Sequence, residues 1–221
     1  ITDITDRKLA DQRQALESRL LEAISSGLPL AEVLAGIARG VEEVLPGSAA
    51  CILAADAEGV LRLAAAPNLP PGLLERIRSQ QIGPESGLCA AAAYRRLPVT
   101  SEDILQDPQW SEVGKTALEE GLRACFAVPV LGRRSEVQGT VAAYYSKPYH
   151  LEPDELAFLE RTAHIAGIAI QRDRREQELR LLEVAVSRLN DLVLITEAEV
   201  YDEGGPRILY VNDALVRRTG Y

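Results

Sequence analysis

Three cysteines are the side chains in this chain best suited to nucleophilic or redox chemistry. They are Cys51, Cys89 and Cys125, the only thiols among the 221 residues. Cys89 falls at the start of a predicted helix, where the positive end of the helix dipole lowers a thiol pKa. So few cysteines, so widely spaced, argue against a disulfide framework and a zinc site. Reduced thiols are typical of a cytosol-like compartment, so we expect a cytoplasmic location, although the parent protein could be membrane-anchored.

The cysteines have a second interpretation, because buried cysteines usually behave as small apolar side chains. A redox thiol also needs a resolving thiol nearby, and the sequence predicts Cys51 and Cys125 to lie on strands. The histidines, His150 and His164, have no metal-ligand spacing with a cysteine. We therefore predict packing for the thiols and surface or interface positions for the histidines, with no catalytic residue and no metal.

Besides the cysteines and the histidines, several polar residues in predicted loops are candidates for ligand contact. Glu102, Asp103 and Asp107 could face a ligand or a cation, but Asp in such loops more often makes a turn with its own backbone. The loop 83–87 precedes a helix, for which Ser86 is the predicted cap, and offers free N–H groups to an anion. It lacks the lysine and the glycine spacing of a P-loop, so the sequence does not predict a nucleotide phosphate site there.

Composition narrows the possible functions. The chain is 47% hydrophobic with a net charge of -9, which supports a folded core and argues against a general nucleic-acid binder. No apolar run approaches the roughly 18 residues of a membrane span, so we expect no membrane contact by this segment. The chain contains no methionine and begins at Ile1, so we expect it to be part of a longer protein.

Hydrophobic periodicity predicts helices and strands in an α+β order. Predicted helices span 6–27, 29–45, 70–80, 87–97, 112–120, 153–189 and 212–221. Predicted strands span 49–55, 60–65, 98–100, 122–131, 137–145, 191–196 and 207–211. The helix 153–189 has two apolar stripes, one suited to cover a sheet and one suited to pair with another helix.

Local motifs in this order resemble a GAF domain over residues 28–170. They are Ile82-Gly83-Pro84, Gly87-Leu88-Cys89, Asp107-Pro108-Gln109-Trp110, Gly121-Leu122-Arg123-Ala124-Cys125-Phe126, Gly139-Thr140-Val141 and the run 163–170. The resemblance implies a central antiparallel sheet with helices on its faces, flanked by long coiled-coil-like helices. It also implies a ligand cavity, for which we predict Cys89, Asp103, Trp110, Phe126 and Tyr144 as contacts; the cofactor stays unidentified. The alternative for the aromatic residues is ordinary core.

The two ends of the chain resemble parts of PAS domains. Residues 1–8 resemble the end of one and residues 191–221 the start of another, joined to the GAF domain by linker helices at 9–27 and 171–190. This arrangement is similar to bacterial sensory proteins that end in cyclic-di-GMP synthesis or hydrolysis domains, or in histidine kinase domains. None of those output motifs is present in the chain.

The resemblance implies a regulatory module that binds a small ligand and signals through a homodimer. The predicted dimer interface lies on the flanking helices, at Leu16, Leu20, Ile165, Ile168, Leu179, Leu182 and Val186. Two other functions stay open. One is a thiol-based enzyme similar to the free methionine sulfoxide reductases, from whose pattern the segment Gly87–Ala93 departs because no glycine follows Cys89. The other is a structural dimerisation module that binds nothing.

Overall fold

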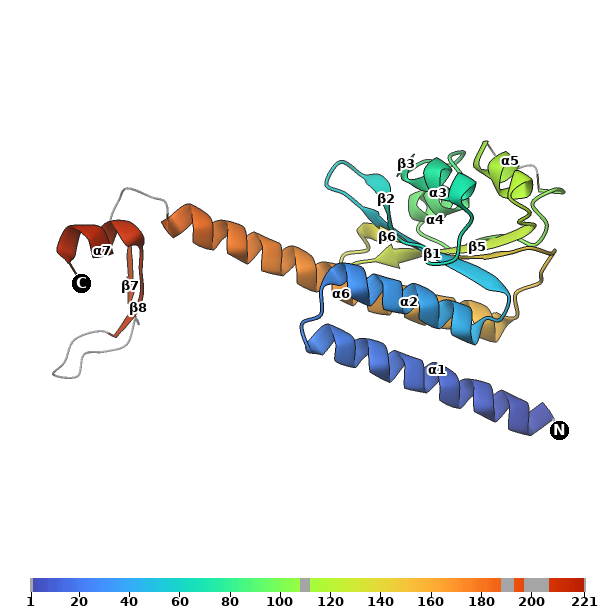
Figure 1. The fold of residues 1–221 in the computed structure, drawn as a ribbon, viewed down its shortest axis with the longest axis horizontal. Helices are drawn as coiled ribbons and strands as arrows, with labels where there is room; N and C mark the ends of the chain where they lie inside the picture. The colour runs from blue at the N-terminus through green and yellow to red at the C-terminus, as the bar shows by residue number, and fades with distance from the viewer. Residues whose placement is uncertain (1, 108–111, 188–192, 197–206, 221) are drawn as a thin grey trace. The chain divides into compact units, whose positions relative to one another are not determined.

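A six-stranded antiparallel sheet forms the centre of the first of two units in the chain (Figure 1). The computed structural model describes residues 2–107, 112–187, 193–196 and 207–220, with side chains from residue 10 onward. The first unit ends at Gln171 and the second begins at Arg172. The strand order in the sheet is β3-β2-β1-β6-β5-β4. The strands are β1 (Ser48–Ala55), β2 (Val60–Ala65), β3 (Ser79–Gln81), β4 (Val99–Ser101), β5 (Ala124–Leu131) and β6 (Val137–Tyr145).

The three central strands are buried on both faces, which explains their almost continuous apolar sequences. In β1 and β6 the register pairs Cys51 with Ala142, and in β5 and β6 it pairs Cys125 with Tyr144. Side chains of a strand alternate between faces, so this register decides which residues can meet on one side of the sheet. The predicted fold class is confirmed.

Helices α1 (Thr2–Ser25) and α2 (Leu30–Val44) and the first part of α6 (Pro153–Ser187) cover one face of the sheet (Figure 1). Their apolar stripes form one core cluster with the side chains of β1, β5 and β6 that face these helices. The cluster includes Ile37 of α2, Phe158 of α6 and Phe126 of β5. Burial of this amphipathic face stabilises helices that would be marginal in isolation.

The opposite face carries the shorter helices α3 (Pro71–Ile77), α4 (Leu88–Arg95) and α5 (Glu112–Glu119). The helix predicted to reach residue 80 ends at Ile77, because Ser79–Gln81 pairs with β2 as strand β3. The predicted cap of α4 is also wrong: Gly87, not Ser86, occupies the cap position, without a side-chain hydrogen bond. Gly87 has φ 106°, which favours glycine, and a Cβ there would lie 3.2 Å from Val113.

The second unit contains the remainder of α6, the two-stranded sheet of β7 (Leu194–Thr196) and β8 (Ile208–Val211), and α7 (Asp213–Thr219). Asn212 caps α7 by accepting a hydrogen bond from the Leu215 N–H. The same Oδ1 accepts from the Val193 N–H at 3.0 Å, and Nδ2 donates to the Val186 carbonyl. One asparagine thereby connects α6, the start of β7 and α7. The two strands and the helix predicted for this region are observed, with β7 beginning at Leu194, β8 at Ile208 and α7 at Asp213.

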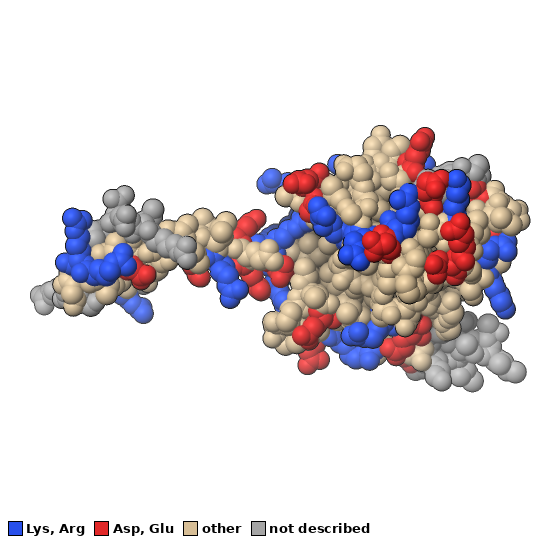
Figure 2. Space-filling view, turned by 45° about the horizontal axis from the view of Figure 1, so that its top comes forward, with Lys and Arg blue, Asp and Glu red and all other residues tan. Residues whose placement is uncertain are grey.

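Basic and acidic side chains are interspersed over the first unit on the face shown in Figure 2. This mixed pattern differs from the continuous basic face that nucleic-acid binding requires. Among the described residues, we find no helix with the length and apolar character needed to cross a membrane.

Candidate functional site

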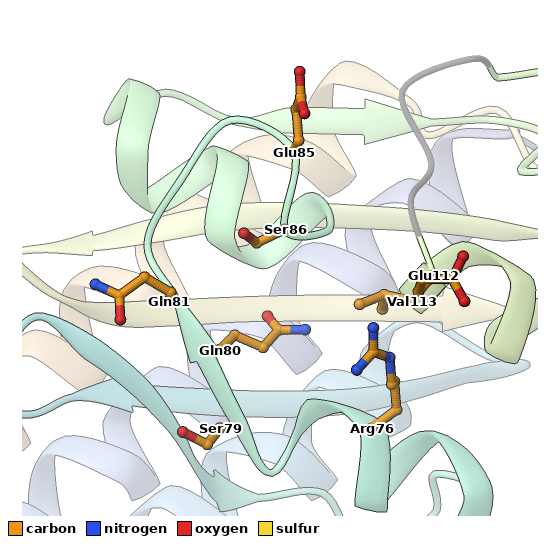
Figure 3. A pocket seen from close by; sticks show the side chains of 8 residues that line it. All are labelled: Arg76, Ser79, Gln80, Gln81, Glu85, Ser86, Glu112 and Val113. Carbon is orange, nitrogen blue, oxygen red and sulfur yellow. The ribbon is translucent and has the colours of Figure 1, made fainter.

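A polar pocket of about 350 Å³ opens between α3, β3, the loop after β3 and the start of α5 (Figure 3). Each of these segments contributes side chains to the lining. The lining residues are Arg76, Ser79, Gln80, Gln81, Glu85, Ser86, Glu112 and Val113. The volume suits a small metabolite.

Gln80 is the buried polar residue of this pocket. It pairs with Leu61 in the β2–β3 register, so its side chain turns to the covered face of the sheet and is 6% exposed. Its Oε1 has no hydrogen-bond partner among the described residues. A buried polar atom without a partner costs roughly 1–3 kcal/mol, so a bound molecule that donates to it would gain affinity.

The charged side chains at the pocket differ in whether they already have a partner in the protein. Glu112 accepts a hydrogen bond from Lys115 Nζ at 2.6 Å, and this bond lowers the pKa of Glu112, with a smaller contribution from the charge of Arg76. Arg76 makes no hydrogen bond or ion pair with the described residues. In Figure 3 its guanidinium extends toward the region between Gln80 and α5. The pocket therefore offers a cation without a close partner near the paired carboxylate of Glu112, whereas the Glu85 side chain points away from the other lining residues (Figure 3).

The three cysteines, although far apart in the sequence, belong to one buried core cluster. Cys51 comes from β1, Cys125 from β5 and Cys89 from the first turn of α4. Cys89 Sγ lies 4.0 Å from Tyr144 Oη. Strand pairing accounts for this grouping, because it brings together residues that are distant along the chain.

The thiols of this cluster differ in how readily they ionise. A hydrogen bond from Cys51 lowers the pKa of Cys89, aided by Thr140 and Tyr144 against the opposing effect of burial. The same bond raises the pKa of Cys51, and burial raises the pKa of Cys125.

The predicted ligand contacts do not form one site. Tyr144 and Cys89 meet, but Phe126 belongs to the core on the opposite face of the sheet. The reason is the two-residue period of β5, which places Cys125 and Phe126 on opposite faces. Phe126 packs edge-on against Tyr145 and Tyr149 at ring-centre distances of 6.0 and 6.1 Å. Trp110 lies outside the described residues.

Asp103 has a structural partner. Both of its carboxylate oxygens accept from Arg123 Nη2 at 2.9 Å, and its Oδ1 also accepts from the Leu105 N–H. The hydrogen bond from Arg123 lowers the pKa of Asp103. Asp103 therefore holds the turn after β4, the non-ligand role considered for it, and it does not line the pocket.

The histidines occupy surface positions. His150 Nδ1 lies 2.7 Å from Glu102 Oε1, and this hydrogen bond raises the pKa of His150. His164 is exposed on α6. Across the described part of the chain, no cluster of three or more His, Cys, Asp and Glu side chains is arranged to hold a metal ion.

The predicted dimer residues divide into two groups. Leu16, Leu20 and Ile165 are buried in the core of their own chain, so they are already covered without a partner. Ile168, Leu179 and Leu182 are exposed, and Val186 is half-buried. An open groove of about 590 Å³ runs between α1 and α6, with Leu21, Ile165 and Ile168 in its lining. The predicted interface stays a prediction, carried by the exposed residues of α6.

Family comparison agrees with this geometry, since the GAF domain model matches residues 27–171. The chain belongs to the GAF family. It is 31% identical over 226 residues to the methyl sulfide methyltransferase-associated sensor of Methanosarcina acetivorans, a match that covers 100% of this chain. The chain spans only 22% of the length of that sensor.

Solved structures share the GAF fold at lower identity. The GAF domain of a phosphoenolpyruvate-protein phosphotransferase from Coxiella burnetii matches with a TM-score of 0.65 and 18% identity, over 76% of this chain and 98% of that one. A free methionine-R-sulfoxide reductase from Neisseria meningitidis, solved with its substrate, matches with a TM-score of 0.62 and 18% identity, over 76% and 93%. At these identities the likeness concerns the fold.

Sequence reasoning considered the loop 83–87, which contributes Glu85 and Ser86 to the lining, but it missed Arg76, Gln80 and Glu112. The available signal was the polar pair Gln80-Gln81 directly before Ile82. A short strand over 79–81 turns Gln80 inward by its alternation, whereas a continued helix does not predict this.

Proposed function

We propose that this GAF domain is the sensory module of a larger signalling protein and that the pocket beside β3 binds its ligand. The observation that carries the proposal is the buried Gln80 side chain, whose Oε1 lacks a partner among the described residues. Arg76 adds a guanidinium at the same pocket. Both groups are suited to polar recognition, and their desolvation is favourable only when a ligand pairs with them.

The charge of the lining favours a small zwitterion, such as a free amino acid. A pure anion would meet Arg76 but also the carboxylate of Glu112, and a pure cation would leave Arg76 without a partner. A ligand with both charges places its carboxylate at Arg76 and its ammonium toward Glu112, with Gln80 Oε1 as a further acceptor.

The signal would leave through α6. This helix begins in the first unit, where Phe158 and Ala166 are buried against the sheet, and continues into the second unit.

We propose that the terminal segments belong to PAS domains, that the module acts as a homodimer in the cytoplasm, and that the parent's output is a histidine kinase or a cyclic-di-GMP enzyme. A change in α6 would then bias the next domain. The similarity to the methyl sulfide methyltransferase-associated sensor of Methanosarcina acetivorans supports the sensory role.

Ligand binding can be tested by thermal unfolding with a panel of free amino acids and their N-acetyl and carboxamide derivatives. We expect at least one free amino acid to raise the melting temperature and its two derivatives to lose most of that shift. Arg76→Gln should abolish the shift. Arg78→Gln is the matched control, because Arg78 is paired with Glu75 at 2.8 Å and does not line this pocket. An unchanged shift in Arg76→Gln would reject the site, and no shift with any free amino acid would reject the ligand class.

The sensory role is proposed as non-catalytic. Reductases of this fold are the competing function, and the occurrence of Cys51 and Cys89 in one buried cluster is the observation that favours a reductase. Both thiols are buried, however, and lie outside the pocket lining. Incubation with free methionine sulfoxide and a dithiol should therefore give no turnover. Turnover that is lost in Cys89→Ser would establish the enzyme instead.

A further inference from the structure

We propose that the pocket beside β3 selects free amino acids whose side chain ends in a primary carboxamide, namely glutamine and asparagine. This inference rests on the proposed function and names the chemical group that the pocket distinguishes. The Gln80 side chain carries it, because this side chain is 6% exposed and makes no hydrogen bond with the described residues. A buried amide without partners is complementary to a ligand that supplies both.

A primary carboxamide is the group that supplies both partners at once. It has a carbonyl oxygen that accepts and an N–H₂ group that donates, so two such groups can exchange two parallel hydrogen bonds in one plane. Turning the Gln80 amide over exchanges its two ends, so Gln80 presents one donor and one acceptor in either orientation. A ligand carboxamide therefore satisfies Gln80 completely.

Strand β3 positions this amide at the pocket. Pairing with Leu61 of β2 turns the Gln80 side chain inward, whereas its neighbours Ser79 and Gln81 are exposed. In Figure 3 the amide end of Gln80 points toward Val113 and the guanidinium of Arg76. The amide thus lies beside the group proposed to hold the α-carboxylate of the ligand.

Other ligand groups match the Gln80 amide less well. A carboxylate, as in glutamate, brings acceptors but no donor, and the apolar chain of norleucine would cover the amide without a partner. A nucleobase edge carries a donor and an acceptor. None of the lining residues that the structure describes is aromatic, however, so a base would lack a stacking surface.

The geometry of paired amides gives a sharper distinction. Both hydrogen bonds form only if the ligand has an N–H on the same side as its carbonyl oxygen. A primary carboxamide always has such an N–H, whereas the trans secondary amide of glutamate γ-methylamide has its single N–H on the opposite side. This derivative keeps the charges of glutamine and loses one of the two bonds.

The test measures dissociation constants by isothermal titration calorimetry with the full chain at neutral pH. The ligands are glutamine, asparagine, glutamate, norleucine and glutamate γ-methylamide, with hypoxanthine as the free base. We expect glutamine or asparagine to bind at least about tenfold more tightly than each of the other ligands, because a missing hydrogen bond leaves a buried donor or acceptor unsatisfied.

Gln80→Met should remove this preference, so that glutamine binds no more tightly than norleucine. The methionine side chain needs no hydrogen bond, so the variant should fold at least as stably as the unsubstituted chain, which thermal unfolding without ligand checks. Gln80→Leu replaces a variant that fails to fold. Gln14→Met is the matched control: Gln14 is exposed on α1 and does not line the pocket, so the preference should persist.

The outcomes separate this inference from the proposed function. If another free amino acid binds as tightly as glutamine and asparagine, and Arg76→Gln abolishes that binding, the carboxamide selection is wrong while the proposed site stands. If no free amino acid binds, the proposed ligand class fails and the selection fails with it. A preference for glutamine that survives in Gln80→Met, or binding of hypoxanthine in place of the amino acids, would overturn the carboxamide pairing.

Discussion

At the scale of single residues, Asp103 and Arg123 show how a candidate ligand contact becomes a structural ion pair. The Arg123 Nη2 donates to both carboxylate oxygens, and the Arg123 backbone N–H donates to the Tyr145 carbonyl. The pair therefore ties the turn after β4 to the end of β6. Because Asp103 is held as a carboxylate in the folded protein, its contribution to stability depends on pH.

Asp103→Asn should lower the melting temperature by a few degrees near neutral pH, because the ion pair is lost. The pKa of Asp103 in the folded protein lies below its ordinary value of 3.8. The ion pair's contribution is therefore complete above that value and disappears as the pH falls through the lower, folded-state pKa. Thermal unfolding from neutral pH down to about pH 2.5 should show the two proteins converging in acid.

The control for this comparison is Asp11→Asn, at an exposed position of α1. Its difference from the unsubstituted protein should stay small across the same pH range. A difference for Asp103→Asn that persists unchanged in acid would contradict the ion-pair explanation.

At the scale of elements, the docking of α1 onto α2 includes one especially close contact. Leu16 is 3% exposed and packs over Gly40, where a Cβ would come within 2.5 Å of Leu16 Cδ1. The missing side chain at Gly40 allows the two helices to approach each other closely. α1 is therefore part of the core of the first unit.

Leu16→Ala should lower the free energy of unfolding by about 2–5 kcal/mol, because it leaves a cavity between α1 and α2. Leu21→Ala on the same helix is the matched control, since Leu21 is 45% exposed and should change stability by less than about 1 kcal/mol. Denaturant titration measures both. Equal effects would show that α1 does not dock as described.

The sequence predicts the individual helices and strands better than it predicts which of them pack or pair with one another. The apolar stripe of α2 and the alternation of β6 are local patterns, and both elements are observed where they were expected. The thiol cluster depends on the pairing of β1 with β6 and β5, which no local pattern specifies. The pocket was missed for a related reason: β3 has three polar residues, and only pairing with β2 makes it a strand.

At the scale of the whole molecule, the proposed homodimer depends on the part of α6 in the second unit. Leu179 and Leu182 are both 61% exposed in the single chain, which is costly for large apolar side chains at helical spacing. A parallel pairing of two α6 helices would cover them. The buried Leu16 and Leu20 would then stabilise each subunit separately.

Leu182→Asp should convert the dimer to a monomer, because it places a charge in the helix seam. Leu181→Asp is the control: this residue is 71% exposed but lies off the predicted seam, so the dimer should persist. Light scattering over a range of protein concentrations measures both. A monomeric unsubstituted chain at high concentration would contradict the dimer.

The burial of side chains changes along helix α6, and this change affects how fast its amide hydrogens exchange with solvent. Up to Ile170 most side chains on its inner face are buried, whereas from Glu176 to Glu183 every side chain is exposed. Amide hydrogens in the first part can exchange with solvent only when the core opens, but those in the second part exchange by local fraying. The boundary near Gln171 is therefore a place where helix can be lost or gained without unfolding the GAF domain.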